Sequence, residues 1–135
     1  MRRTLWPDCS DDRHELEMVT ARDQSHGGTT FVYDRGNGSL GGFVELSVRN
    51  IVDGAQSDRV AYIEGWYVDP DLRKRGIGRA LIQAAETWAI SRGLNELGSD
   101  AELHNEESIT AHKALGFRET FRVVQFLKAI PARVD

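Results

Sequence analysis

Residues 73–79 read RKRGIGR and join a β-rich stretch (59–69) to an amphipathic segment that begins near Gly76. A glycine-rich turn at a helix start lets several backbone N–H groups point at one anion, because no Cβ stands in the way. The helix dipole adds partial positive charge at that end, and four basic side chains add full charges. The stretch therefore predicts a phosphate or pyrophosphate site. For the loop taken alone, an ordinary surface helix opened by a glycine turn is the alternative.

The glycine spacing excludes two common phosphate loops. A Walker-type loop needs four residues between its glycines and then Lys with Ser or Thr, whereas Arg79 and Ala80 follow Gly78. A dinucleotide-binding loop needs a third glycine where Leu81 stands. The remaining pattern, Arg-x-x-Gly-x-Gly, resembles the pyrophosphate loop of the GNAT superfamily of N-acetyltransferases, which bind acetyl-coenzyme A (acetyl-CoA). The resemblance assigns these residues to the cosubstrate: Arg73, Arg75, Gly76, Ile77, Gly78, Arg79 and Ala80.

Composition indicates one globular domain over residues 1–135. Charged residues make up 28% and hydrophobic residues 40% of the chain, which is typical of a soluble protein. No apolar run approaches the roughly 20 residues of a membrane span, and the first residues lack a secretory signal. The single cysteine, Cys9, excludes an internal disulfide and fits the reducing cytoplasm. The net charge of −4 argues weakly against nucleic acid and for cationic partners, and no residue cluster has metal-ligand spacing.

Patterning along the chain predicts alternating helices and strands. Ser10–Asp12 offers N-cap chemistry for a helix that runs to about Arg22, with Leu16 and Val19 inward and Met18 as a further candidate. Strands are predicted at 29–34, 40–49, 59–68, 94–100 and 120–129, with a hairpin turn at 35–39 and a loop at 53–54. Further helices are predicted from 76 to a C-terminal glycine at 93, and over 105–115. This order predicts an α/β sandwich around a mixed sheet.

The GNAT resemblance extends well beyond the loop. Residues 67–70 look like the end of the family's fourth strand, where the fourth and fifth strands of a mostly antiparallel sheet splay apart at a bulge. The pantetheine arm lies in that split, so the resemblance assigns Tyr67, Val68 and Asp69 to the cosubstrate. It makes the backbone amide of Val68 an oxyanion-hole donor. Asn105 matches a further coenzyme A contact, and residues 114–117 match the closing Leu-Gly-Phe signature.

A narrower resemblance links the chain to the aminoglycoside 6′-N-acetyltransferases. The matching segments are residues 5–7, 11–12, 64–68, 98–100, 105–108 and 112–117. The resemblance implies that Trp6, Glu64 and Asp100 line the antibiotic site. Trp66 is open between a core residue and a wall of that site. The expected activity is direct transfer of an acetyl group from acetyl-CoA to the 6′-amine of an aminoglycoside.

The chemistry of amine acetylation suits a pair of acids. An amine attacks a thioester only when neutral, yet alkylamines with a pKa near 9–10 are mostly protonated at neutral pH. A nearby carboxylate binds the ammonium form and then accepts its proton, directly or through water. We expect Glu64 to be the base or relay and Asp100 the substrate anchor or shared base. The alternative is that both are solvated acids at strand ends.

The chain departs from the resemblance at several positions. His112 stands where many superfamily members have a tyrosine that protonates the leaving thiolate, so it is a candidate general acid, with a packed helical histidine as the alternative. Phe121 stands where the aminoglycoside branch usually has a substrate-facing acid, and Cys9 where it often has a polar contact. The family's N-terminal strand is apparently missing. Because the branch commonly dimerises through its C-terminal strands, we expect a homodimer.

Two other functions remain open at this point. One is acetylation of a polyamine or a protein amine by the same fold. The other is a truncated, inactive GNAT domain that binds coenzyme A without catalysis. Turnover with aminoglycosides, with other amines only, or with none distinguishes the three.

Overall fold

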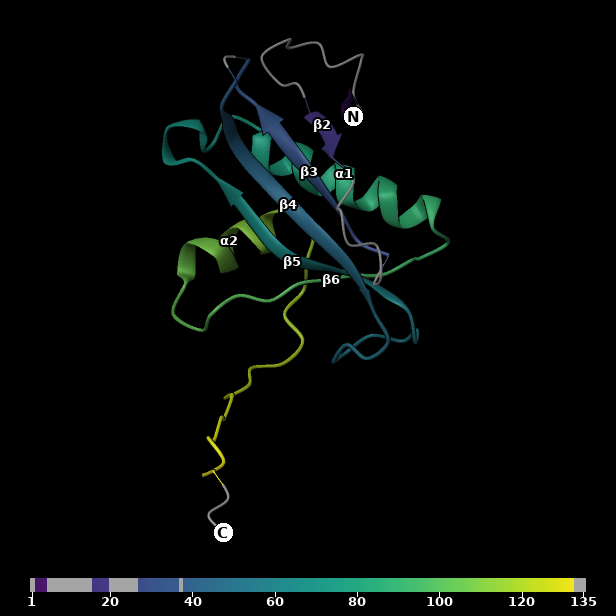
Figure 1. Ribbon diagram of the computed structural model, residues 1–135, viewed down its shortest axis with the longest axis vertical. Helices are drawn as coiled ribbons and strands as arrows, with labels where there is room; N and C mark the ends of the chain where they lie inside the picture. The colour runs from purple at the N-terminus through teal and green to yellow at the C-terminus, as the bar shows by residue number, and fades with distance from the viewer. Residues whose placement is uncertain (1, 5–15, 20–26, 37, 133–135) are drawn as a thin grey trace.

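The computed structural model describes residues 2–4, 16–19, 27–36 and 38–132. Within these residues six strands form one sheet, ordered along the sheet as along the chain (Figure 1). Each strand is antiparallel to its neighbour except the last, which runs parallel to the fifth because a helix carries the chain across. The strands are β1 (Arg2–Thr4), β2 (Leu16–Val19), β3 (Thr29–Asp34), β4 (Leu40–Arg49), β5 (Val60–Val68) and β6 (Leu97–Gly98). The helices are η1 (Pro70–Leu72, 3-10), α1 (Ile77–Ser91) and α2 (Glu106–Ala114).

The hairpin of β3 and β4 follows the sequence prediction residue for residue. In β4 buried and exposed residues alternate from Phe43 to Leu46, and Val44, Leu46 and Phe31 of β3 are buried on the side of the core. Arg35 N donates to Ser39 O across the turn at 3.0 Å. This hairpin supplies the rigid floor against which the next strand is placed.

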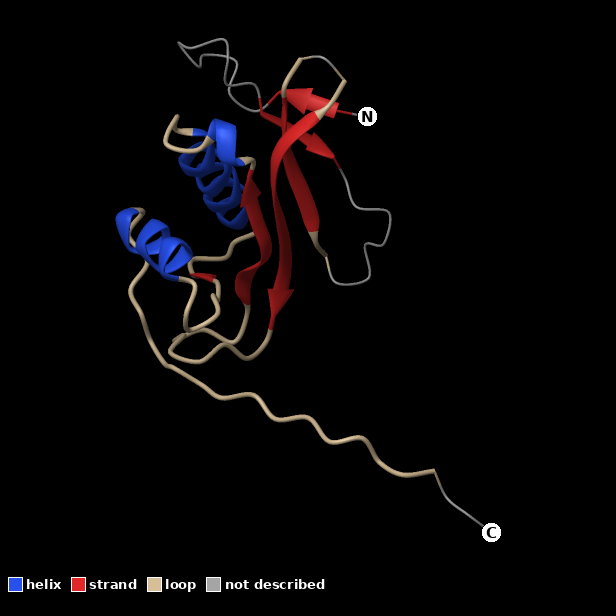
Figure 2. Cartoon of the chain, turned by 90° about the vertical axis from the view of Figure 1, so that its left-hand side faces the viewer, coloured by secondary structure: helices blue, strands red, loops and turns tan. Residues whose placement is uncertain are grey.

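Helix α1 packs its apolar stripe on β3, β4 and β5. Ile77, Leu81, Ala85 and Trp88 are buried at the spacing of one helix face. Gly93, with φ +75°, follows the C-cap and ends the helix as predicted. Figure 2 shows α1 and α2 on the same side of the sheet. None of the residues of α2 is buried, so this helix is held mainly by its ends and by one histidine.

A bulge in β5 sets the direction of the functional side chains. Glu45 pairs with Gly65 and Leu46 with Ile63, so Glu64 is an additional residue without a partner on β4. The bulge lets Ile63 and Trp66 both face the core, while Glu64 lies with Ser47 on the opposite face of the sheet. The bulge was expected at 67–70 and occurs earlier in the strand.

Three predicted elements are corrected. Residues 16–19 form a strand and not part of a helix, because they pair with the free edge of β3, which supplies backbone hydrogen bonds that a local pattern does not reveal. The strand predicted at 94–100 shrinks to two residues, since β5 and β6 pair only at two positions. Residues 120–129 form no strand and extend away from the body (Figure 2).

Two absences hold for the described residues. In that part of the chain no helix is long and apolar enough to cross a membrane. Within the same ranges no group of three His, Cys, Asp or Glu side chains has the arrangement of a metal site.

Candidate active site

The RKRGIGR loop leads into α1 in the way an anion site requires. Gly76 is the N-cap with φ +85°, a left-handed conformation that side-chain-bearing residues rarely adopt. No side chain caps the first turn of α1, so its N–H groups are available to a ligand. Arg75 and Arg79 are exposed beside this turn. The helix start therefore presents backbone donors and positive charge to the same region of solvent.

Arg73 has a different role from its neighbours in the loop. Its Nε donates to the carbonyl oxygen of Val68 at 2.9 Å, and its Nη1 donates to Glu107 Oε1 at 3.0 Å. Its guanidinium also lies 5.7 Å from the ring centroid of Tyr67. Arg73 thus ties the end of β5 to the start of α2, and holds the loop as well as adding charge to it.

The expected splay of two neighbouring strands is confirmed, and in this chain it lies between β5 and β6. The two strands pair only at Ala61–Leu97 and Tyr62–Gly98, so residues 63–68 have no neighbour on the β6 side. Asp69 N donates to Gly41 O at 2.8 Å, which makes these two residues a hydrogen-bonded pair of the antiparallel ladder. The next pair, Gly42 and Val68, is then a non-hydrogen-bonded pair. The N–H of Val68 therefore points away from β4 and into the opening.

Trp66 and Gly78 form the base of the opening. A Cβ at Gly78 would lie 3.3 Å from Trp66 Cζ2, so the helix start packs directly on the indole. The Trp66 indole N–H is buried and has no hydrogen-bond partner in the described part of the chain. The indole N–H of Trp88 in the core is buried and without a partner in the same way, so this feature is shared by two tryptophans on the core side.

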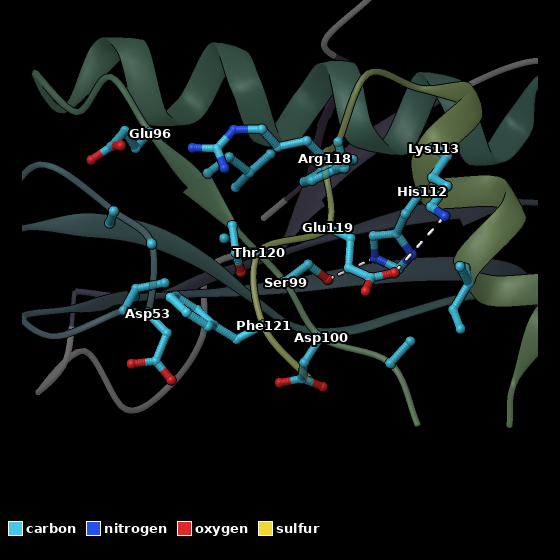
Figure 3. Close-up of a pocket in the computed structure, with 18 of the residues that line it drawn as sticks. Asp53, Glu96, Ser99, Asp100, His112, Lys113, Arg118, Glu119, Thr120 and Phe121 are labelled. Atoms are coloured by element: carbon cyan, nitrogen blue, oxygen red, sulfur yellow. Dashed lines mark hydrogen bonds and ion pairs between the residues drawn. The ribbon is translucent and has the colours of Figure 1, made fainter. Parts of the chain in front are cut away.

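His112 is held by four neighbours on one side of the same opening. Its Nδ1 donates to Ser108 O at 2.7 Å, because a carbonyl oxygen only accepts. In the neutral ring, Nε2 then accepts from Ser99 Oγ, 2.8 Å away (Figure 3). The imidazole also meets Trp66 and Phe117 edge to face, at 5.1 Å between centroids in each case. The sequence placed Ser99 in the matching segment 98–100 without a role, and the tertiary contact with His112 reveals one partner for it.

Glu64 is paired with a basic residue that sequence reasoning did not single out. Arg49 Nε donates to Glu64 Oε2 at 3.0 Å and its Nη2 to Oε1 at 2.8 Å. Ser47 Oγ donates to Oε2 at 2.5 Å. The hydrogen bonds from Arg49 hold the pKa of the Glu64 carboxyl below its usual range, although partial burial opposes this. The strand alternation that places residues 47 and 49 on one face was the available signal.

Asp100 is exposed just beyond β6 and accepts a hydrogen bond from Tyr62. The hydroxyl of Tyr62 lies 2.5 Å from Asp100 Oδ2. Burial, and then this hydrogen bond, raise the pKa of Tyr62 well above its usual range, so it remains a neutral donor. The Arg49 guanidinium lies 3.6 Å from the centroid of the Tyr62 ring. Arg49 and Tyr62 therefore link the two predicted acids into one cluster.

A cavity of about 450 Å³ lies between β6, α2 and the following chain. Asp100, His112 and Phe121 are among the residues that line it (Figure 3). Its other charged side chains include Asp53, Glu96 and Glu119. The cavity is large enough for part of a small molecule beside the splay.

Comparisons with known proteins identify the family. Residues 1–117 match the family described as acetyltransferase (GNAT). The chain belongs to this family. The aminoglycoside N(6′)-acetyltransferase type 1 of Klebsiella aerogenes is 39% identical over 132 residues, which cover 96% of this chain and 87% of the relative. The protein of the same name from Acinetobacter genomosp. 13 is 41% identical over 131 residues, which cover 96% of this chain and 88% of the relative.

Solved structures agree with this GNAT assignment. The aminoglycoside 6′-N-acetyltransferase AAC(6')-Ih from Acinetobacter baumannii has a TM-score of 0.72 and 38% identity, over 80% of this chain and 74% of that chain. AAC(6')-Iy, in complex with the bisubstrate analog CoA-S-monomethyl-acetylneamine, has a TM-score of 0.71 and 36% identity, over 76% of this chain and 70% of that chain. The expected family and fold are confirmed.

The predicted cosubstrate residues of this GNAT chain separate into two groups. The N–H of Val68 faces the opening, Arg75 and Arg79 are exposed beside the start of α1, and their roles towards the cosubstrate stay predictions. Asp69 and Asn105 are engaged locally: Asp69 accepts from Arg35 at 2.7 Å, and Asn105 Oδ1 accepts from Ser108 N at 3.1 Å as the N-cap of α2. A role for Asn105 towards the cosubstrate would fall to its remaining amide N–H groups.

The predicted acceptor residues of the GNAT site are only partly brought together. Glu64 and Asp100 are linked through Arg49 and Tyr62, whereas Trp66 lies on the core side, under the loop. Phe121 lines the cavity but is 64% exposed. The predictions for Trp6 and Cys9 concern positions outside the described residues.

Proposed function

We propose that this chain is an acetyl-CoA-dependent N-acetyltransferase that acetylates the 6′-amine of an aminoglycoside by direct transfer, with both substrates bound. The family and the named relatives support this reaction. The observation that carries the proposal is the opening between β5 and β6. There the N–H of Val68 points into the opening, and β5, which ends at Val68, also carries Glu64 of the acid cluster.

Acetyl-CoA fits the residues around this opening. The first turn of α1, with Arg75 and Arg79, suits the pyrophosphate, because backbone N–H groups and the helix dipole both favour anions. The exposed edge of β5 suits an extended arm that pairs with its free backbone groups. The thioester would supply the acetyl group that is transferred.

The acids prepare the acceptor amine. Asp100, with Glu64 in the same cluster, attracts the ammonium form, and a carboxylate accepts its proton directly or through water. The nitrogen lone pair then forms a bond to the thioester carbonyl carbon, and the carbonyl electrons move onto oxygen. The N–H of Val68 donates a hydrogen bond to that oxygen and stabilises its developing charge.

The leaving sulfur completes the reaction. When the carbonyl re-forms, the carbon–sulfur bond breaks and its electron pair stays on sulfur as a thiolate. The amine nitrogen carries a positive charge after the attack and gives up its second proton to solvent. His112, protonated from solvent, donates from Nε2 to Ser99 Oγ, and the hydroxyl donates its own proton to the thiolate. The products are the amide, free coenzyme A and a proton released to solvent.

The test is thiol release from acetyl-CoA in the presence of kanamycin or tobramycin, with NMR used to locate the acetyl group on the product. Acetylation of the 6′-nitrogen is expected. Turnover with spermidine or lysine peptides only would replace the aminoglycoside by another amine. Coenzyme A binding without turnover of any amine would leave a binding domain and overturn the proposal.

We also propose that the protein is a cytoplasmic homodimer. Residues 118–132, here called the C-terminal tail, carry six exposed large apolar side chains: Phe121, Val123, Val124, Phe126, Leu127 and Ile130. The described strand order ends at β6, which pairs with β5 on one side. An apolar segment and an open sheet edge suit strand pairing between two copies. The single cysteine suits a reducing compartment.

A further inference from the structure

Arg49 places one of the protein's own positive charges on the acceptor side of the proposed site. It is the last residue of β4 and lies on the face that carries Ser47 and Glu64. Its two hydrogen bonds engage both oxygens of Glu64, and Ser47 adds a third bond to one of them. A bidentate guanidinium–carboxylate pair of this kind is well oriented and strong for a partly exposed pair. Glu64 therefore has little capacity left for a second cation.

Asp100 differs from Glu64 in this respect. The hydroxyl of Tyr62 engages Oδ2, and within the described residues no hydrogen bond reaches Oδ1. The side chain is exposed, so an ammonium group can approach it from solvent. A neutral donor on one oxygen orients the carboxylate without cancelling its charge. Asp100 is thus an oriented acid that retains its negative charge for a ligand.

The charges of the cluster also distinguish Asp100 from Glu64. Glu64 and Arg49 cancel, Tyr62 is neutral, and Asp100 contributes one negative charge. The Arg49 guanidinium lies over the ring of Tyr62, the residue that donates to Asp100. A second ammonium group that approached Glu64 would meet a fixed positive charge at hydrogen-bond distance from the same carboxylate.

We infer that Arg49 determines how cations are received in the acceptor site: it takes the place of an ammonium group at Glu64 and directs the reacting amine to Asp100. This inference rests on the proposed function. The site then accepts one ammonium group where a pair of unpaired acids would accept two. Arg49 is a specificity-determining residue that acts by repulsion, since it limits affinity for ligands that carry several ammonium groups close together.

The test compares Arg49→Met and Arg49→Gln with Arg49→Lys and with Arg59→Met, which removes an exposed arginine outside the cluster. Kanamycin binding is measured by calorimetry, KM and kcat by thiol release, and folding by Tm. The two neutral variants are expected to bind kanamycin more tightly and to have a lower KM, by roughly 5-fold for one partly exposed charge, with kcat changed less than about 2-fold. Arg49→Lys and Arg59→Met are expected to show no gain.

A double substitution separates this role from a structural one. Adding Glu64→Gln to Arg49→Met is expected to remove the gain, because the released carboxylate is its source. If Arg49 only braces the bulge, its neutral variants lower Tm and leave kanamycin affinity unchanged or weaker, which overturns the inference. Calorimetry measures the affinity for kanamycin whether or not the protein acetylates it. An absence of acetyl transfer by the unaltered protein therefore refutes the proposed function, and an absence of gained affinity refutes the role of Arg49.

Discussion

At the scale of single residues, the acceptor side is a chain of four side chains and not a pair of free acids. Glu64 is bound by Arg49, Arg49 lies over Tyr62, and Tyr62 donates to Asp100. A carboxylate that already accepts three hydrogen bonds is a weak base, because those bonds stabilise its ionised form. Asp100 is therefore better placed to take the proton of the amine.

The first prediction separates these two acids. Asp100→Asn is expected to lower kcat/KM by roughly 100-fold, because it removes the general base and keeps the shape of the side chain. Glu64→Gln is expected mainly to raise KM, since it leaves the positive charge of Arg49 without its partner. Thiol release over a range of aminoglycoside concentrations measures both. Unchanged kcat/KM in both variants would remove the acids from the mechanism.

At the scale of elements, the start of α1 requires glycine at two positions, for a different reason at each. Gly76 needs a left-handed backbone, whereas Gly78 needs space, because Trp66 lies against it. The indole in turn contacts His112, so the loop, the bulged strand and α2 meet around one side chain. Changes at either glycine are therefore expected to affect cosubstrate binding, but for distinct reasons.

The second prediction concerns these glycines. Gly76→Ala is expected to cost about 1 kcal/mol of stability and to weaken coenzyme A binding, because a strained loop no longer aims its N–H groups. Gly78→Ala is expected to weaken coenzyme A binding with a smaller loss of stability, since a Cβ displaces Trp66 by a few tenths of an ångström. Calorimetry with coenzyme A and thermal unfolding measure the two effects.

Gly36→Ala is the matched control for backbone strain. Gly36 has φ +89° in the β3–β4 turn, and nothing lies within 4 Å of a Cβ built there. It is expected to lose stability and to bind coenzyme A normally. If Gly36→Ala weakened coenzyme A binding as much as Gly76→Ala, the effect would be general destabilisation and not a local one.

At the scale of the whole molecule, the C-terminal tail is a segment whose large apolar side chains are exposed in the single chain. Leu115 and Phe117 pack against the core, but from residue 118 onward the chain is exposed, and Phe126 is 92% exposed. Thr120 still contacts the loop at Gly54, so the tail leaves the body beside the cavity that Asp100 lines. A second copy that covers the tail would also enclose this cavity.

The third prediction tests this dimer. Phe126→Glu is expected to raise the dimer dissociation constant roughly tenfold or more, because it places a charge in an apolar contact. Ile90→Glu is the control, since Ile90 is an exposed apolar residue on α1, outside the tail. Sedimentation velocity measures both. A monomeric unaltered protein, or equal behaviour of the two variants, would contradict the dimer.

The local sequence pattern was enough to predict elements that are determined by residues close to them in the chain. The strands at 29–34 and 40–49 and the two glycine-bounded ends of α1 were predicted because alternation, turn residues and caps act over a few positions. The strand at 16–19 was missed, since its hydrogen bonds come from β3. The predicted strand at 120–129 has strong β patterning, and no strand among the described residues pairs with it.

The sequence by itself determined the family and predicted the phosphate loop and the two acids, because glycine spacing and charge are properties of neighbouring residues. Only the tertiary structure decided which side chains those acids pair with. The bulge at Glu64 and the register of β4 with β5 bring Arg49 onto one acid, and the end of β6 brings Asp100 to Tyr62. Charge pairing depends on distance in space, which strand register sets and sequence separation does not.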